Sequence, residues 1–302
     1  YNHDDIDMPK VPRIGDNELD EMSRWLYYAH GGDLDEVTDE HVRNARHAYY
    51  GMISYCDDKV GRLMKTLEEV GLTDDTVVIF TADHGEMLGE RGGWYKQYFY
   101  EHSARVPFIV SCPERYKPAR VSECVSLADI LPTTMDLACE GNDWEPTRPL
   151  DGSSVTSLLE GDASKWDNTV ISEYSGEGAC APCRMVRRGN YKLIYTHGHP
   201  DLLYDLAADP DELTNLAEDD AHAEVHAELR DALFADWDPE DVNSRVLQSQ
   251  ADRLFIQSVT EGEPTWAFKL RPDDDRRYVR KAGAVQTKAK ARYPFIAPPP
   301  IR

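Results

Sequence analysis

The sequence lacks the features that mark several classes of protein. No apolar run approaches the length that crosses a lipid bilayer, and no signal peptide opens the chain, so we expect no contact with a membrane. Positive charge is scarce, with 33 Lys and Arg against 56 Asp and Glu. The resulting net charge of −23 argues against a nucleic-acid partner, which requires a basic surface. Only six scattered cysteines occur, which favours reduced thiols and a cytoplasmic location.

The first half of the chain alternates helical and strand-like patterns. Apolar residues recur at helical spacing over 39–70, and helix 129–138 carries a proline in its first turns. Apolar runs at 76–82 and 106–112 indicate buried strands. This alternation predicts an α/β fold, in which a mixed central sheet is sandwiched by helices. We assign this domain to residues 1–162.

The pattern changes beyond residue 162. We expect a small α+β subdomain over 163–240, built from an antiparallel sheet and one helix. Its predicted elements are strands at 169–173, 184–188 and 191–196 and a helix at 220–235. Residues 241–302 form a third segment, whose last part is basic and rich in proline. In an acidic protein such an extended tail is either a disordered end or an arm that docks on a neighbouring acidic subunit.

Residues 78–96 carry the most informative motif. An apolar run ends abruptly in Asp83-His84-Gly85, and a glycine-containing loop then leads to Lys96. In open α/β sheets, ligands bind at the carboxyl ends of strands. A carboxylate and an imidazole at such an end suit a metal ion, and a lysine one loop later suits an anion. The plainer interpretation is that these are ordinary turn residues followed by a surface lysine.

The residues beyond this motif favour the metal interpretation. Several segments, taken in order along the chain, closely resemble the sulfatases of the alkaline-phosphatase superfamily, and most of all their choline-sulfatase and phosphonate monoester hydrolase branch. The segments that carry the resemblance are Asp83-His84-Gly85, Lys96, Arg105-Val106-Pro107, 127–133, 151–154, 187–192 and 203–206. They extend over about two thirds of the chain. The resemblance therefore implies the α/β sulfatase fold and a sulfuric ester hydrolase.

One part of the family pattern does not occur where it is expected. Sulfatases carry a paired Asp-Asp and a Cys-x-Pro-x-Arg nucleophile motif well before the Asp-His-Gly element, and neither lies upstream of Asp83. We therefore expect this chain to be the C-terminal part of a sulfatase. The nucleophile segment would then belong to another chain, would have been removed by cleavage, or would be missing because the gene is truncated. Cys180-Ala181-Pro182-Cys183-Arg184 matches the motif by letters, but it lies on the wrong side of the metal motif, so we interpret it as a chance match.

The resemblance implies roles for individual residues. Asp83 and His84 would supply part of the shell of one divalent metal, either Ca²⁺ or Mn²⁺, because an imidazole shifts the preference away from calcium's all-oxygen shells. His84 and Lys96 would be the catalytic residues on this chain, with Lys96 also contacting the sulfate oxygens. The nucleophile would be a formylglycine on the absent segment. Glu177, and less so Glu173, would bind a quaternary ammonium group.

Three functions are compatible with the sequence. The first is hydrolysis of a small sulfate ester, with choline sulfate preferred, by a homo-oligomer (dimer or tetramer) assembled through the C-terminal arm. The second is hydrolysis of a phosphonate monoester or phosphodiester at the same metal loop. The third is a truncated, non-catalytic relative. For the two glutamates, the plainer interpretation is an acidic loop on an acidic protein.

Overall fold

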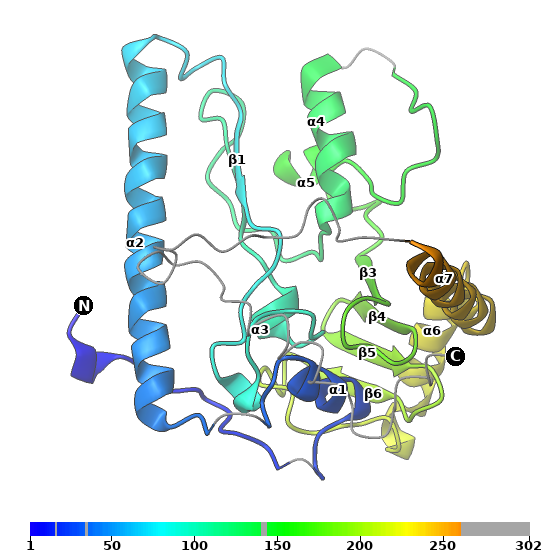
Figure 1. Cartoon of the computed structure of the whole chain (residues 1–302). Coiled ribbons are helices and arrows are strands. Elements are labelled where there is room, and N and C mark those ends of the chain that lie inside the picture. The colour runs from blue at the N-terminus through cyan, green and yellow to red at the C-terminus, as the bar shows by residue number, and fades with distance from the viewer. Residues whose placement is uncertain (16, 34–35, 140–143, 261–302) are drawn as a thin grey trace.

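A long helix and two antiparallel sheets organise the chain (Figure 1). The computed structural model describes residues 1–15, 17–33, 36–139 and 144–260. The predicted basic, proline-rich end of the tail, residues 261–302, therefore lies outside the described residues. Across the part that is described, no helix is both long and apolar enough to cross a membrane.

The first region contains the long helix α2 (Asp39–Glu69) and a two-stranded sheet. Thr38 and His41 form a capping box at the start of α2, and Gly71, with φ of 68°, follows its end. Strands β1 (Val78–Thr81) and β2 (Phe108–Ser111) pair antiparallel. Both strands and the helix lie where the sequence predicts them, with the strands shortened by one or two residues at each end. The predicted burial of the two strands is wrong, because none of their residues is buried.

Short helices connect these elements. Helix α4 (Ile130–Cys139) confirms the helix expected at 129–138. The other short elements are η1 (His3–Asp5), α1 (Glu21–Ala29), η2 (Glu90–Gly92), α3 (Glu101–Ala104), η3 (Leu127–Asp129) and α5 (Thr156–Leu159).

The second region is a four-stranded antiparallel sheet in the order β3-β4-β5-β6. Its strands are β3 (Thr169–Tyr174), β4 (Cys183–Arg188), β5 (Tyr191–Thr196) and β6 (Leu202–Asp205). The sheet is followed by η4 (Asp220–His222) and α6 (Ala223–Phe234), which together match the predicted helix at 220–235. The sequence does not predict strand β6.

Side chains alternate between the two faces of this sheet, as the pleat requires. Neighbouring residues therefore belong to different cores: Leu193 faces α6, whereas Ile194 faces α1 and the loop before α3. The core on the α6 side contains Val186, Leu193, Leu203, Leu229 and Leu233. The opposite core includes Trp25, Leu26, Met87, Phe99, Met185 and Ile194. The sheet is thus covered on both faces.

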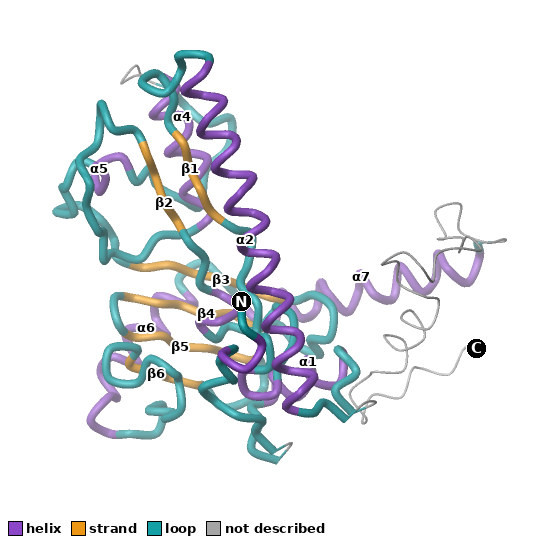
Figure 2. Tube along the Cα trace, turned by 90° about the vertical axis from the view of Figure 1, so that its left-hand side faces the viewer, coloured by secondary structure: helices purple, strands orange, loops and turns teal. Residues whose placement is uncertain are grey.

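A further helix, α7 (Pro239–Val259), begins after the Asp238 cap and extends away from the sheet (Figure 2). The sequence analysis assigns most of this stretch to the tail from its shift in composition and predicts no helix there. None of the residues of α7 is buried, and all of them are described.

The α/β class is confirmed, and the described strands form antiparallel pairs in both sheets. The division into 1–162, 163–240 and 241–302 stays a prediction.

Candidate functional site

Asp83 and His84 lie just past the carboxyl end of β1. The backbone N–H of His84 donates to Asp83 Oδ1 at 3.0 Å, which fixes the carboxylate beside the strand end. His84 Nδ1 lies 2.7 Å from the carbonyl oxygen of Gly85, so Nδ1 carries the proton and donates it. In the neutral ring this bond leaves the lone pair on Nε2, which lies 3.5 Å from Asp83 Oδ2. The two side chains thus present one nitrogen and one oxygen acceptor close together.

Gly85 brings this strand end against a second segment of the chain. Its N–H donates to the carbonyl of Ser103 at 2.8 Å, and the N–H of Glu86 donates to the carbonyl of His102 at 2.8 Å. A Cβ at position 85 would overlap the carbonyl oxygen of His102. Only glycine permits this approach, which explains the third residue of the Asp-His-Gly motif.

Lys96 lies in a loop that we call the lysine loop, residues 88–100. The residues on either side of Lys96 have left-handed backbone, with φ of 66° at Tyr95 and 88° at Gln97. His30 holds one of them, since its Nε2 lies 2.7 Å from Gln97 Oε1. Lys96 itself is exposed, and no hydrogen bond or ion pair to its ammonium group occurs among the described residues.

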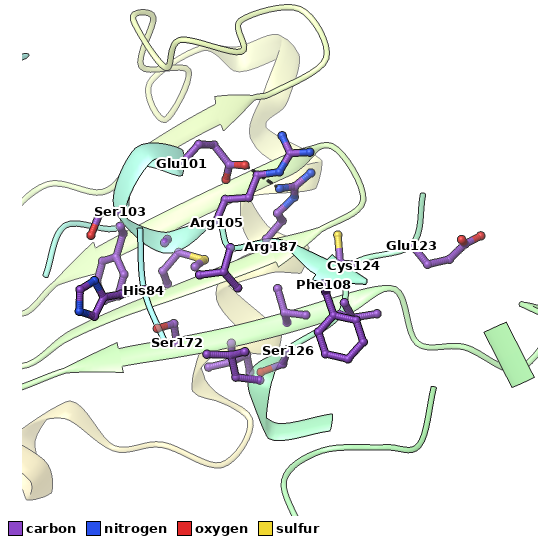
Figure 3. A pocket seen from close by; sticks show the side chains of 18 of the residues that line it. His84, Glu101, Ser103, Arg105, Phe108, Glu123, Cys124, Ser126, Ser172 and Arg187 are labelled. Carbon is purple, nitrogen blue, oxygen red and sulfur yellow. Dashed lines mark hydrogen bonds and ion pairs between the residues drawn. The ribbon is translucent and has the colours of Figure 1, made fainter. Parts of the chain in front are cut away.

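Asp83, His84 and Lys96 all line one cavity of about 1050 Å³ between the two sheets. Figure 3 shows part of its wall, with His84, Glu101 and Arg187 labelled. Its cationic lining residues are Lys96, Arg105, Arg120 and Arg187. Its acidic lining residues are Asp83, Glu101, Glu123 and Glu173. With His84 neutral, these charges cancel, whereas the whole chain carries −23. The cavity is therefore much less repulsive to an anion than the rest of the surface.

Glu101 connects the cavity to the interior of the four-stranded sheet. Its Oε2 accepts from Arg187 Nη1 at 3.0 Å, and its Oε1 lies 2.6 Å from Nζ of the buried Lys192. Burial raises the pKa of Glu101, but Lys192, Arg187 and Arg105 outweigh burial, and the net effect lowers it. Sequence reasoning missed this group. Its one available signal was Lys192, a charged residue at an inward position of an apolar strand.

The two glutamates expected to bind an ammonium group are placed differently. Glu173 lines the cavity, and its Oε2 lies 3.7 Å from Arg184 Nε. Glu177 is not among the lining residues, and its carbonyl accepts from the Tyr174 hydroxyl at 2.7 Å. Burial, with a smaller contribution from Glu177, raises the pKa of Tyr174 to about 12. The structure therefore brings Glu173, and not Glu177, together with Asp83, His84 and Lys96.

The Cys180–Cys183 segment lies at the start of β4, and neither cysteine lines the cavity. Burial raises the pKa of Cys180 to about 11 and that of Cys183 to about 12. Both therefore stay protonated near neutral pH and are poor nucleophiles. All six cysteines of the chain are free thiols.

Two family models match the chain. The sulfatase family matches residues 9–140, and the C-terminal region of N-sulphoglucosamine sulphohydrolase matches residues 89–237. The choline-sulfatase of Rhizobium meliloti is 36% identical over 293 residues, which cover 95% of this chain and 56% of that protein. Human arylsulfatase K is 33% identical over 232 residues, covering 72% of this chain and 41% of that protein. The chain thus spans about half the length of the choline-sulfatase and less of arylsulfatase K.

Solved structures lead to the same group. The phosphonate monoester hydrolase of Silicibacter pomeroyi is similar with a TM-score of 0.65 and 26% identity, over 78% of this chain and 51% of that one. The phosphonate monoester hydrolase of Agrobacterium radiobacter gives a TM-score of 0.59 and 33% identity, over 66% of this chain and 42% of that one. Together the family models, the relatives and the fold establish that this chain belongs to the sulfatase family of the alkaline-phosphatase superfamily.

Proposed function

We propose that the whole protein to which this chain belongs hydrolyses a small sulfate ester, with choline sulfate as the first candidate. The observation that carries the proposal is the meeting of Asp83, His84 and Lys96 around one cavity at the carboxyl end of β1. The identity to a choline-sulfatase supports the choice of substrate.

Asp83 and His84 are suited to supply some of the ligands of a divalent metal ion. The bond from His84 Nδ1 to Gly85 leaves Nε2 free to coordinate, an arrangement that orients histidine ligands in metal sites generally. In the described part of the chain, no group of three or more His, Cys, Asp and Glu side chains is arranged to hold an ion. The two residues would therefore supply part of the shell, with the remaining ligands from another segment. When bound, Ca²⁺ or Mn²⁺ would supply positive charge for the sulfuryl oxygens.

Lys96 would add the second positive group. It lines the cavity, so its ammonium can contact a sulfate oxygen and stabilise the negative charge that develops on the leaving oxygen. Because no carboxylate of the described residues holds this ammonium, contact with the substrate breaks no ion pair seen there. The nucleophile, a formylglycine in this proposal, would come from a segment outside this chain.

Choline recognition would use Glu173 together with the aromatic ring of Tyr174, both of which line the cavity. A quaternary ammonium needs an aromatic face and a carboxylate but no hydrogen-bond donor. Glu177 would contribute only after its loop moves toward the cavity.

The proposed cytoplasmic location agrees with the six free thiols. Assembly through residues 241–302 stays a prediction.

The second candidate is phosphonate monoester hydrolysis, which the two similar hydrolase structures favour. The deciding experiment measures kcat/KM of the complete protein for choline sulfate and for a phosphonate monoester. We expect the higher value for choline sulfate. A higher value for the phosphonate replaces our first candidate by the second, and no turnover of either substrate refutes both.

A further inference from the structure

Lys192, in β5, is a fully buried lysine that the proposed reaction does not use; its exposed fraction is 0%. A buried ammonium group is costly unless it is paired and hydrogen-bonded. Lys192 Nζ has three partners: it donates to the carbonyl of Phe99 at 2.9 Å and to Glu212 Oε1 at 2.8 Å, and Glu101 Oε1 lies 2.6 Å away. These partners satisfy all three of its N–H groups.

The partners of Lys192 lie at the end of the lysine loop. Phe99 is three residues after Lys96, and Glu101 is the first residue of α3. Glu212 binds this end a second time, because its Oε2 accepts from the backbone N–H of Glu101 at 2.8 Å. The carboxylate of Glu212 therefore joins the lysine ammonium to the backbone that follows the loop.

The other end of the lysine loop is tied to the same place. Arg91 Nη2 donates to the carbonyl of Asp211 at 2.8 Å and to the carbonyl of Glu212. Residues 211 and 212 thus hold the loop on both sides of Lys96. Glu212 adopts φ of 55°, a conformation that a non-glycine residue keeps only where its surroundings enforce it.

The lysine loop between Arg91 and Glu101 depends on these contacts to keep its conformation. Tyr95 and Gln97 both have left-handed backbone, and the ammonium of Lys96 has no partner among the described residues. The direction of Lys96 is therefore set by its loop and not by contacts of its own side chain. A displacement of about 1 Å in such a group can lower a rate by about 100-fold.

We infer that Lys192, acting with Glu212, is a positioning residue that holds the lysine loop so that Lys96 faces the cavity. This inference rests on the proposed function, because it assigns a purpose to the position of Lys96. Through Glu101, the same lysine also reaches Arg187, whose Nη1 lies 3.0 Å from Glu101 Oε2 in the cavity wall. One buried charge thereby orients groups at two places in the site.

The test compares the complete wild-type protein with its Lys192→Met variant in two measurements that need no turnover. The first is hydrogen exchange of the backbone amides of residues 95–101. The second is the rate at which limiting acetic anhydride acetylates Lys96, with and without inorganic sulfate. We expect at least about tenfold faster exchange in 95–101, and a loss of the sulfate protection of Lys96. In the steady state we expect kcat to fall about 100-fold while KM changes less.

Asp201→Asn is the matched control. The Asp201 side chain is buried beside α6, where it accepts from His226 Nε2 at 2.8 Å and from Arg230. Within the described structure, the hydrogen bonds and ion pairs of this carboxylate do not reach the lysine loop, so the variant loses a buried ion pair without touching residues 88–100. We expect its exchange in 95–101 and its Lys96 labelling to stay within about twofold of wild type.

A folded Lys192→Met protein that matches Asp201→Asn in exchange and in labelling overturns the inference. If Lys192→Met does not fold, Glu212→Gln decides by the same two criteria, because it keeps the shape of the side chain and removes its charge. The two proposals fail separately. If exchange and labelling change as expected while the wild type hydrolyses neither a sulfate nor a phosphonate ester, the proposed function is lost and the positioning of Lys96 stands.

Discussion

The two sheets of the molecule differ in how they bury cross-strand pairs. In the four-stranded sheet, Leu193 of β5 lies opposite Leu203 of β6, and both have an exposed fraction of 0%. In the two-stranded sheet, Phe80 of β1 lies opposite Ile109 of β2, and these are 40% and 57% exposed. Burial of apolar area is the main favourable term in folding. We therefore expect the four-stranded sheet to contribute more stability than the two-stranded sheet, which carries the proposed metal motif.

This contrast shows how chemistry and stability are divided in the chain. The proposed metal ligands Asp83 and His84 follow the lightly packed sheet, and the lysine loop, which carries Lys96 to the same cavity, packs on the well-packed one. Substitutions should therefore separate into those that remove activity and those that remove stability. Four predictions test this division, beginning with the largest effect.

Asp83→Ala should abolish activity without affecting stability. Its side chain is 86% exposed, so its loss removes almost no packing, but it takes away a proposed metal ligand. We expect kcat/KM of the complete protein to fall by about 10³-fold, or about 4 kcal/mol, with an unchanged melting temperature. Steady-state kinetics and metal analysis after dialysis measure both effects. Full activity with normal metal content would remove Asp83 from the site.

Leu193→Ala should have the opposite effect. The side chain is fully buried against α6, so the truncation should cost about 2–5 kcal/mol of unfolding free energy. Ile109→Ala, in the exposed pair, is the matched control and should cost less than about 1 kcal/mol. Urea denaturation at neutral pH measures both variants. Equal losses would show that the two sheets contribute alike and that the comparison is wrong.

Gly85→Ala should affect both properties, because it acts where the two regions meet. The added Cβ would overlap the carbonyl of His102, which forces the metal motif away from the segment after the lysine loop. We expect a loss of about 1–3 kcal/mol in stability, together with lower kcat/KM. Gly61→Ala is the control, because a Cβ there meets nothing within 4 Å in helix α2. It should stabilise the protein by about 0.5–1 kcal/mol and leave kcat/KM unchanged.

The smallest effect concerns acid stability. The folded pKa of Glu101 lies below its usual value of 4.5. Burial raises this pKa, but the positive charges of Lys192, Arg187 and Arg105 lower it by more. A carboxyl group with a depressed pKa contributes stability above its unfolded pKa, and this contribution is lost as the pH falls through its folded pKa. Below about pH 4.5, stability should therefore decline more steeply in wild type than in Glu101→Gln. Urea titrations from neutral pH to about pH 3 measure the slopes, and parallel curves would contradict the assigned pairing.

Local patterns account for what the sequence predicted correctly. Strand β5 occupies the predicted residues 191–196, and α2 ends one residue before the predicted end, because each has a clear apolar period and a stop signal. Helix α7 was missed because its helical character comes from propensity and the Asp238 cap instead of an apolar face. Strand β6 was missed because Leu202–Asp205 shows no polar and apolar alternation and does not belong to a longer apolar run like those at 76–82 and 106–112.

The site was predicted in part, for a similar reason. Asp83 and His84 are adjacent in sequence, and Lys96 follows by one loop, so a local motif reveals them. In the second cluster, Glu101 lies 91 positions before Lys192 and 111 positions before Glu212. A local sequence pattern cannot reveal contacts over such separations. Glu177, expected at the substrate, lies in the turn after β3 and is not among the residues that line the cavity, so its role stays a prediction. The catalytic and metal-binding roles stay predictions for the experiments above.

The alternation of β5 has a consequence for how the chain finds its native pairing. A slip of β5 by one residue would exchange its two faces. Lys192 would then enter the leucine-rich layer beneath α6, and Leu193 would confront the carboxylates of Glu101 and Glu212. With an aliphatic residue at position 192, both the native and the shifted pairing of β5 would bury an apolar side chain. With lysine, the shifted pairing would bury an unpaired ammonium group, which is very costly. We therefore expect the buried lysine to disfavour the shifted pairing of β5 during folding.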